Sequence, residues 1–151
     1  MPVREPPLLG TSHFRVLIGR REVGFCEISR ITSATDVALP PEERAPGFET
    51  VVLRRALTQS TELYDWRRKI ATGKRDLRAV TIQQLDSAGG EIVNAWRLEG
   101  AWPCRWSGPA FDAAANDIAF EELELCFDDI VWLEEPEPSK QSRSHTKTQG
   151  V

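Results

Sequence analysis

The sequence predicts a mainly β fold: a small β-barrel or sandwich of long antiparallel hairpins with one flanking α-helix. Three observations predict it. Apolar and polar side chains alternate through most of residues 13–133, as they do in strands with one buried face. Turn-forming residues separate these runs, and a single segment has helical spacing. One helix beside six or seven strands is typical of a small barrel or sandwich, with the helix covering one open end or face.

The N-terminal third predicts a hairpin, a loop and a strand. Residues 14–18 alternate, and the apolar positions of residues 23–31 follow across a turn at 19–22. Residues 36–47 contain three prolines, which lack backbone donors, so we expect a surface loop there. The next strand carries three apolar residues of one parity: Val51, Leu53 and Leu57.

Residues 61–72 have the spacing of an amphipathic helix. Ser60 is placed to cap its start, basic residues lie near its end, and Gly73 follows as a stop signal. The apolar positions recur at steps of three and four: Leu63, Trp66 and Ile70.

Residues 80–106 predict a long antiparallel hairpin around a turn at 86–90. Gly100 and Pro103 interrupt its second strand, so one kinked strand or two successive strands would fit. Six even-numbered residues of that strand are expected to share one face: Ile92, Trp96, Leu98, Trp102, Cys104 and Trp106.

The last run, residues 116–133, changes parity. Its apolar residues fall on even positions as far as Phe120 and on odd positions from Leu123 onward. A slip of one residue exchanges the faces of a strand, so we predict a β-bulge near residues 121–122. Glu122 and Glu124 then point to solvent or to a neighbouring subunit.

The chain divides into an N-terminal arm (1–12), one folded domain (13–133) and a disordered C-terminal tail (134–151). The tail has no apolar residue before Val151, so folding could not offset its ordering entropy. A net charge of -4 argues against a specific nucleic-acid partner, and the basic residues in the middle of the chain are interpreted as solvated flanks. No apolar stretch is long enough for a membrane anchor, and no signal-peptide core is present, so synthesis and folding in the cytosol are expected.

The residue types needed for catalysis are scarce. The two histidines, His13 and His145, stand at the first strand and in the tail, so no general base or metal site is evident. The three cysteines lie far apart and are interpreted as small buried hydrophobes. We therefore expect no enzyme activity and no cofactor. Of the five tryptophans, Trp66 and Trp96 are expected in the core, whereas Trp102 and Trp106 fit either core or interface.

The predicted strands are longer than the usual five or six residues, and long edges must be paired or covered. Pairing with another copy of the chain would satisfy them, so self-assembly is expected.

Several segments in order resemble the tail tube proteins of contractile phage tails and related bacterial contractile injection systems. The resemblance covers nearly the whole folded domain, from Phe14–Ile18 through Leu63–Trp66 and Val80–Asp86. Its most specific parts are Ala101-Trp102-Pro103 and Asn116-Asp117-Ile118-Ala119-Phe120-Glu121.

The resemblance implies a β-barrel subunit that forms hexameric rings. The rings stack into a hollow tube, and contraction of a surrounding sheath drives the tube through a target envelope. The partners implied are further copies of the chain, sheath and baseplate proteins, and cargo in the lumen. Such a chain is made in the bacterial cytoplasm and becomes part of a phage-tail-like particle, with release from the cell as one outcome.

The same resemblance assigns residues to contacts. The hairpin 80–106 and the strand 118–127 would form the barrel and the ring interface, through Trp102, Trp106, Leu98, Ile118, Phe120 and Leu125. Residues 36–48 would contact the next ring, through Pro40, Glu42, Arg44 and Phe48.

Two departures from the family leave alternatives open. The chain has Arg54-Arg55-Ala56 where the family usually has a lysine-arginine-glycine step, and its tail extends beyond the usual end. The chain could instead be a tube-initiating baseplate ring of the same machine. A solitary β-barrel that binds a sugar or small ligand on its tryptophans is the alternative from another class.

Overall fold

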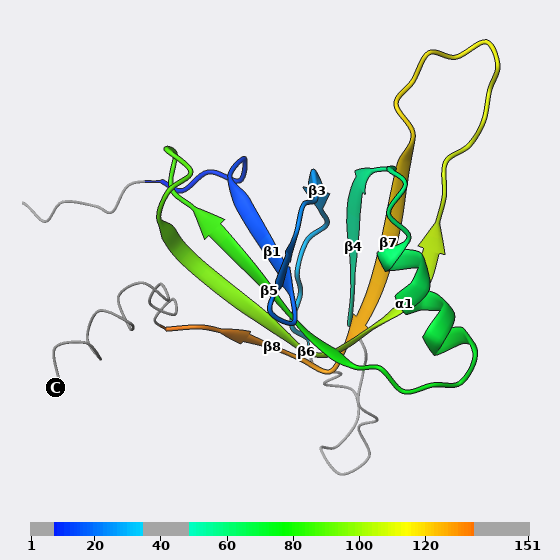
Figure 1. Cartoon of the computed structure of the whole chain (residues 1–151). Helices are drawn as coiled ribbons and strands as arrows, with labels where there is room; N and C mark the ends of the chain where they lie inside the picture. The colour runs from blue at the N-terminus through cyan, green and yellow to red at the C-terminus, as the bar shows by residue number, and fades with distance from the viewer. Residues whose placement is uncertain (1–7, 35–48, 135–151) are drawn as a thin grey trace, which may run out of the picture.

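The computed structural model describes residues 8–34 and 49–134 (Figure 1). Most of the predicted arm and tail, the Pro-rich loop and the ring-to-ring candidates Pro40, Glu42, Arg44 and Phe48 lie outside the described residues. The elements in chain order are β1 (Phe14–Ile18), β2 (Arg21–Val23), β3 (Glu27–Ile28), β4 (Glu49–Ala56), α1 (Glu62–Ala71), β5 (Arg78–Leu85), β6 (Ile92–Ser107), β7 (Phe120–Phe127) and β8 (Asp129–Trp132).

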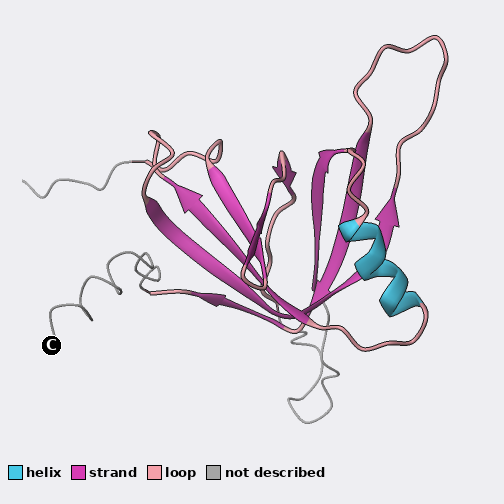
Figure 2. Ribbon diagram, viewed as in Figure 1, coloured by secondary structure: helices cyan, strands magenta, loops and turns pink. Residues whose placement is uncertain are grey.

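The strands form one antiparallel sheet in the order β2-β1-β5-β6-β7-β4-β3, and β8 pairs with β6 beside this path. Figure 2 shows the sheet bent into two layers that meet along β6. The first layer holds β2, β1 and β5, and the second holds β7, β4 and β3, with α1 at its side. The predicted mainly β fold with one flanking helix is confirmed. The barrel prediction is met only in part, because no pairing among the described strands joins β2 to β3. These two end strands have three and two residues and leave the sheet open.

The predicted long hairpin is formed by β5 and β6, which pair from Arg78↔Ala101 to Leu85↔Ile92. β6 is one kinked strand of 16 residues. Its kink is at Gly100, whose φ of 62° lies in the region that favours glycine. On the opposite strand, the backbone N–H of Asp128 donates to the carbonyl oxygen of Glu99 at 2.9 Å, where β7 gives way to β8.

The prediction that six even-numbered residues of β6 share a face is wrong. Leu98 is buried, but after Gly100 the buried residues are Ala101 and Pro103. Trp102 and Cys104 therefore lie on the opposite face. A register shift between Pro103 and Arg105 then returns Trp106 to the core side, where it packs against the hydrophobic cluster. The kink and this bulge each reverse which side of the sheet the following side chains of β6 face.

Gly100→Ala should destabilise the fold by about 1–2 kcal/mol, because an L side chain is disfavoured at positive φ. An added Cβ would also lie 2.3 Å from Oδ2 of Asp128. Urea unfolding followed by tryptophan fluorescence measures the change. Gly90→Ala is the matched control, since a Cβ there meets nothing within 4 Å. Equal midpoints for the two variants would show that the kink does not depend on glycine.

The predicted bulge near residues 121–122 is also wrong. β7 pairs with β4 without interruption, from Glu49↔Phe127 to Arg55↔Glu121 and Ala56↔Phe120. The odd-numbered residues of β7 face the core throughout, and they include a buried glutamate, Glu121. Phe120 lies on the outer face, and Ile118 precedes the strand, so the change of parity in the apolar residues reflects a buried charge.

The first hairpin is confirmed for β1 and β2, which pair through Val16↔Val23. The rest of the predicted second strand leaves this hairpin after Val23. Its continuation, β3, pairs with β4 through Ile28↔Leu53. The run 23–31 thus serves both layers of the sheet, which local alternation alone does not reveal.

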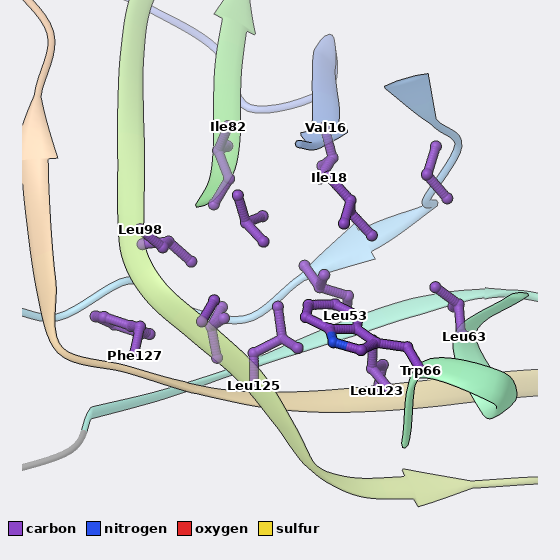
Figure 3. Close-up of a cluster of buried hydrophobic side chains, with 14 residues drawn as sticks. Val16, Ile18, Leu53, Leu63, Trp66, Ile82, Leu98, Leu123, Leu125 and Phe127 are labelled. Carbon is purple, nitrogen blue, oxygen red and sulfur yellow. The ribbon is translucent and has the colours of Figure 1, made fainter. Parts of the chain in front are cut away.

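The helix prediction is confirmed except at its start. Leu63 and Trp66 are buried in the cluster between the two layers (Figure 3). Gly73 has φ 88°, and its N–H donates to the Ile70 carbonyl, which ends the helix as expected. The residue at the N-cap is Thr61, not Ser60, and its hydroxyl donates to Asp65 Oδ2 at 2.8 Å without capping a backbone N–H.

Candidate functional site

The six interface candidates divide into two groups. Leu98 and Leu125 are fully buried in the core of the subunit, so their side chains cannot meet another copy (Figure 3). Trp106 is partly buried and bound within the subunit: its Nε1 donates to Glu121 Oε1 at 2.9 Å, and its ring meets Tyr64 edge-on at 5.2 Å. The three remaining candidates stand on the outer face or in the adjoining loop: Trp102, Ile118 and Phe120.

The outer face of β6, β7 and β4 carries aromatic side chains beside charges. Trp102 lies opposite Cys126 across the β6–β7 pair. The guanidinium of Arg54 covers the ring of Phe120 at 3.8 Å from its centroid. Arg54 also forms an ion pair with Glu122 at 3.5 Å. This half-polar, half-aromatic surface has the composition typical of protein–protein contacts.

Residues 108–119 form a loop that projects beyond the β6–β7 end of the sheet (Figure 1). Two of its large apolar side chains are open to solvent: Phe111 is 89% exposed and Ile118 is 71% exposed. Between the loop and Arg54 lies an open depression of about 980 Å³. We define the assembly surface as Trp102, Phe120, Arg54 and this loop. Its exposed apolar side chains form a patch of the kind found at contact sites.

A buried ionic network lies on the core side of β4 and β7, behind this surface. Glu121 is 2% exposed and accepts from Arg55 Nε at 2.9 Å, while Arg55 Nη1 donates to Glu62 Oε1 at 2.8 Å. Glu62 also pairs with Arg21 at 3.1 Å. Burial alone would lower the pKa of Arg55, but the hydrogen bonds and charges of Glu62 and Glu121 outweigh it and raise that pKa. The network ties α1 to β4 and β7, and its Arg55 Nη2 has no partner among the described residues.

Sequence reasoning missed this network, although a signal for it was present. Arg55 shares the parity of the buried Val51 and Leu53, and Glu121 shares the parity of Leu123 and Leu125. Opposite charges at core positions of two strands indicate a buried pair, because buried charges are found paired.

The cysteines differ in exposure. Cys126 is buried, as expected, and Cys104 is intermediate, but Cys26 is exposed, so the prediction of a buried residue is wrong there. Cys26 follows the point where the chain leaves the first hairpin. Burial raises the pKa of Cys126 to about 12, and its hydrogen bond with Cys104 adds to the rise.

Alkylation should therefore be selective in the folded protein. At pH 8 Cys126 stays a thiol, and the thiolate is the reactive form, so we expect it to react at least about tenfold more slowly than Cys26. Mass spectrometry of peptides after brief treatment with iodoacetamide measures both rates. In denaturant the difference should vanish. Equal rates in the folded protein would contradict the burial of Cys126.

Within the described ranges, no group of three or more His, Cys, Asp or Glu could hold a metal ion. Of the helices that the structure describes, none is long and apolar enough to cross a membrane.

Comparison with known proteins decides the family. The family model described as T4-like virus tail tube protein gp19 matches residues 10–131, which is most of the chain. The chain belongs to this tail tube family. The resemblance seen in the sequence is thereby confirmed. A search of curated proteins gave no match.

Solved structures with a similar fold include chains of contractile injection systems. A chain of the PVC extracellular contractile injection system, in its extended sheath-tube complex, is 26% identical with a TM-score of 0.70, covering 83% of this chain and 91% of that one. A chain of the PVC sheath/tube terminator is 27% identical with a TM-score of 0.70, covering 87% and 99%. Hcp1 from Flavobacterium johnsoniae, at 13% identity and a TM-score of 0.57 over 84% and 99%, shows the fold alone.

Proposed function

We propose that copies of this tail tube protein form hexameric rings that stack into the hollow inner tube of a contractile injection system. A surrounding sheath contracts and drives the tube through a target envelope. The protein acts by assembly and performs no catalysis. It is made in the bacterial cytoplasm and carried in the particle. The observation that carries this proposal is the family match over residues 10–131, together with relatives in sheath-tube complexes.

An open strand edge in the subunit supports the ring. Among the described strands β8 pairs only with β6, so the backbone groups on its other edge have no strand partner there. A strand of a neighbouring copy could satisfy them, and head-to-tail contacts of this kind close into rings when the rotation fits. The barrel that the isolated subunit leaves open would then be completed across subunits. The hairpin of β5 and β6 would contribute its long strands to that shared barrel.

The outer face of β2, β1, β5 and the first half of β6 is suited to line a water-filled lumen. Its charged residues neutralise one another within the face: Arg15 pairs with Glu22 at 3.2 Å and Arg97 with Glu99 at 2.6 Å. Thr81 lies between them, opposite Leu17 on one side and Arg97 on the other. A polar face with paired charges is stable against water and offers no strong binding site to passing cargo.

The assembly surface and the Pro-rich loop would supply the other contacts. Trp102, Phe120 and Ile118 are proposed at the contacts between copies, whereas residues 36–48 are proposed to reach the next ring. The arm 1–12, the domain 13–133 and a tail from residue 134 remain the proposed division of the chain. A solitary sugar-binding module is not favoured, because Trp66 lies in the core and Trp106 is bound to Glu121.

A tube-initiating baseplate ring of the same machine is the second candidate, since a chain of the anti-feeding prophage baseplate shares this fold at 20% identity, with a TM-score of 0.68. Native mass spectrometry of the purified protein, over a range of concentrations, separates the two. A shaft subunit should give hexamers and multiples of hexamers that grow with concentration. An initiator should stop at one hexamer. A monomer at all concentrations would overturn both.

A further inference from the structure

The C-terminal half of α1 and the loop that follows it concentrate positive charge. Residues 67–78 contain six cationic side chains and one acidic one, in a chain with a formal net charge of -4. We define the basic patch as Arg67, Arg68, Lys69, Lys74 and Arg75, with Arg78 at its edge. The patch lies beside the second layer of the sheet, where α1 flanks the molecule (Figure 2).

The single acid of this segment is already engaged. Asp76 accepts from Arg78 Nη2 at 2.8 Å and pairs with Lys69 at 3.6 Å. The hydrogen bond from Arg78 lowers the pKa of Asp76, so its carboxylate stays charged and committed to these partners. Arg67 Nη1 donates to the carbonyl oxygen of Pro103 at 3.2 Å.

Besides Arg67, which binds a carbonyl oxygen, three cations of the patch have no acidic partner among the described residues: Arg68, Lys74 and Arg75. All three are exposed. The negative end of the helix dipole accounts for Arg68 and Lys69, which stand in the last turn. It does not account for Lys74 and Arg75, because the helix has ended before Gly73. These two cations add positive charge where the fold itself does not require it.

The neighbouring surface favours a protein partner over a nucleic acid. Leu77 stands between Asp76 and Arg78 and is 40% exposed, which offers an apolar contact next to the charges. Tyr64, the exposed aromatic residue of α1, has its ring packed edge-on against Trp106 at 5.2 Å. Base stacking on single strands uses exposed aromatic faces, and duplex affinity comes mainly from phosphate contacts, so neither needs an exposed leucine beside the charges.

We propose that the basic patch is a docking surface for an acidic segment of a partner protein. The inference rests on the proposed tube, and the partner is the surrounding sheath that is proposed with it. Lys74, Arg75 and Arg68 supply the attraction, and Leu77 supplies an apolar contact within it. Charge complementarity of this kind fixes register and speeds encounter more than it adds affinity.

The test uses Lys74→Glu/Arg75→Glu, which leaves α1 untouched. The probe is a fluorescent oligoglutamate peptide, followed by anisotropy at low and at physiological salt. We expect the variant to bind the peptide about tenfold more weakly than the parent, because two attractive charges become repulsive. The control is Arg30→Glu, which reverses the charge of one exposed arginine outside the patch and should change binding by less than about twofold.

Three results would overturn the proposal. They are unchanged peptide binding by Lys74→Glu/Arg75→Glu, an equal loss in the control variant, or tighter binding of a DNA duplex than of the peptide by the parent. Ring formation is measured on every variant by native mass spectrometry. Loss of rings in the parent would count against the proposed function, whereas intact rings without patch-dependent binding would count against this inference alone.

Discussion

Glu121→Gln should lower the free energy of unfolding by about 3 kcal/mol. The substitution keeps the shape and an acceptor for Trp106, but it removes the buried charge that faces Arg55 across the β4–β7 pair. Removing one partner of a buried ion pair leaves the other charge uncompensated, which is among the largest single-residue effects in folded proteins. Glu62 still binds Arg55, so the loss stays below that of an isolated pair. Urea unfolding of the purified variant measures the change.

Two further variants make this expectation specific. Glu122→Gln is the matched control, since its side chain is 47% exposed and its ion pair with Arg54 lies at the surface, where a loss below about 1 kcal/mol is expected. Arg55→Met with Glu121→Leu replaces the pair by apolar residues and should recover most of the stability lost in Glu121→Gln. Equal effects of the Glu121 and Glu122 variants would contradict the buried network.

Ile118→Asp should abolish assembly while the subunit stays folded. Ile118 is 71% exposed in the subunit, so the substitution costs less than about 0.5 kcal/mol of folding stability. At an apolar contact a buried, unpaired carboxylate costs several kcal/mol, and a ring repeats the cost at every contact. The variant should sediment as a monomer at concentrations where the parent forms rings. Sedimentation velocity measures the assembly, and circular dichroism checks the fold.

Leu77→Asp is the control for this second expectation. Leu77 is another exposed aliphatic residue, 40% exposed, and it lies in the basic patch, away from the assembly surface. It should leave ring formation intact. Rings of unchanged stability in Ile118→Asp would remove the 108–119 loop from the contacts between copies.

The spacing of apolar residues was sufficient to predict the helix and the strands that keep one face on the core along their whole length. β1, β4, β5 and α1 bury most of the residues expected from their period, because each has one face on the core. The resemblance in the Ala101-Trp102-Pro103 and Asn116–Glu121 segments supplied the family, which the alternation could not.

The structure differs from the prediction where contacts between residues far apart in the sequence determine the fold. At Gly100 a positive φ reverses which side of the sheet the following residues of β6 face. Gly100 lies against the side chain of Asp128, a residue 28 positions later in the sequence. β3 pairs with β4 and does not extend the β1–β2 hairpin, although local alternation predicted one strand over both β2 and β3. The pair of Arg55 and Glu121 occupies core positions, which a rule that places charges outside must miss. Two of the six interface candidates, Leu98 and Leu125, belong to the core for the converse reason: an apolar pattern does not distinguish a core from an interface.

Electron microscopy of the purified full-length protein tests the proposed tube most directly. We expect rings with sixfold symmetry that stack into hollow tubes as the concentration rises, with β8 of each copy paired to a strand of its neighbour at high resolution. A folded monomer at high concentration, with neither rings nor tubes, would contradict the account.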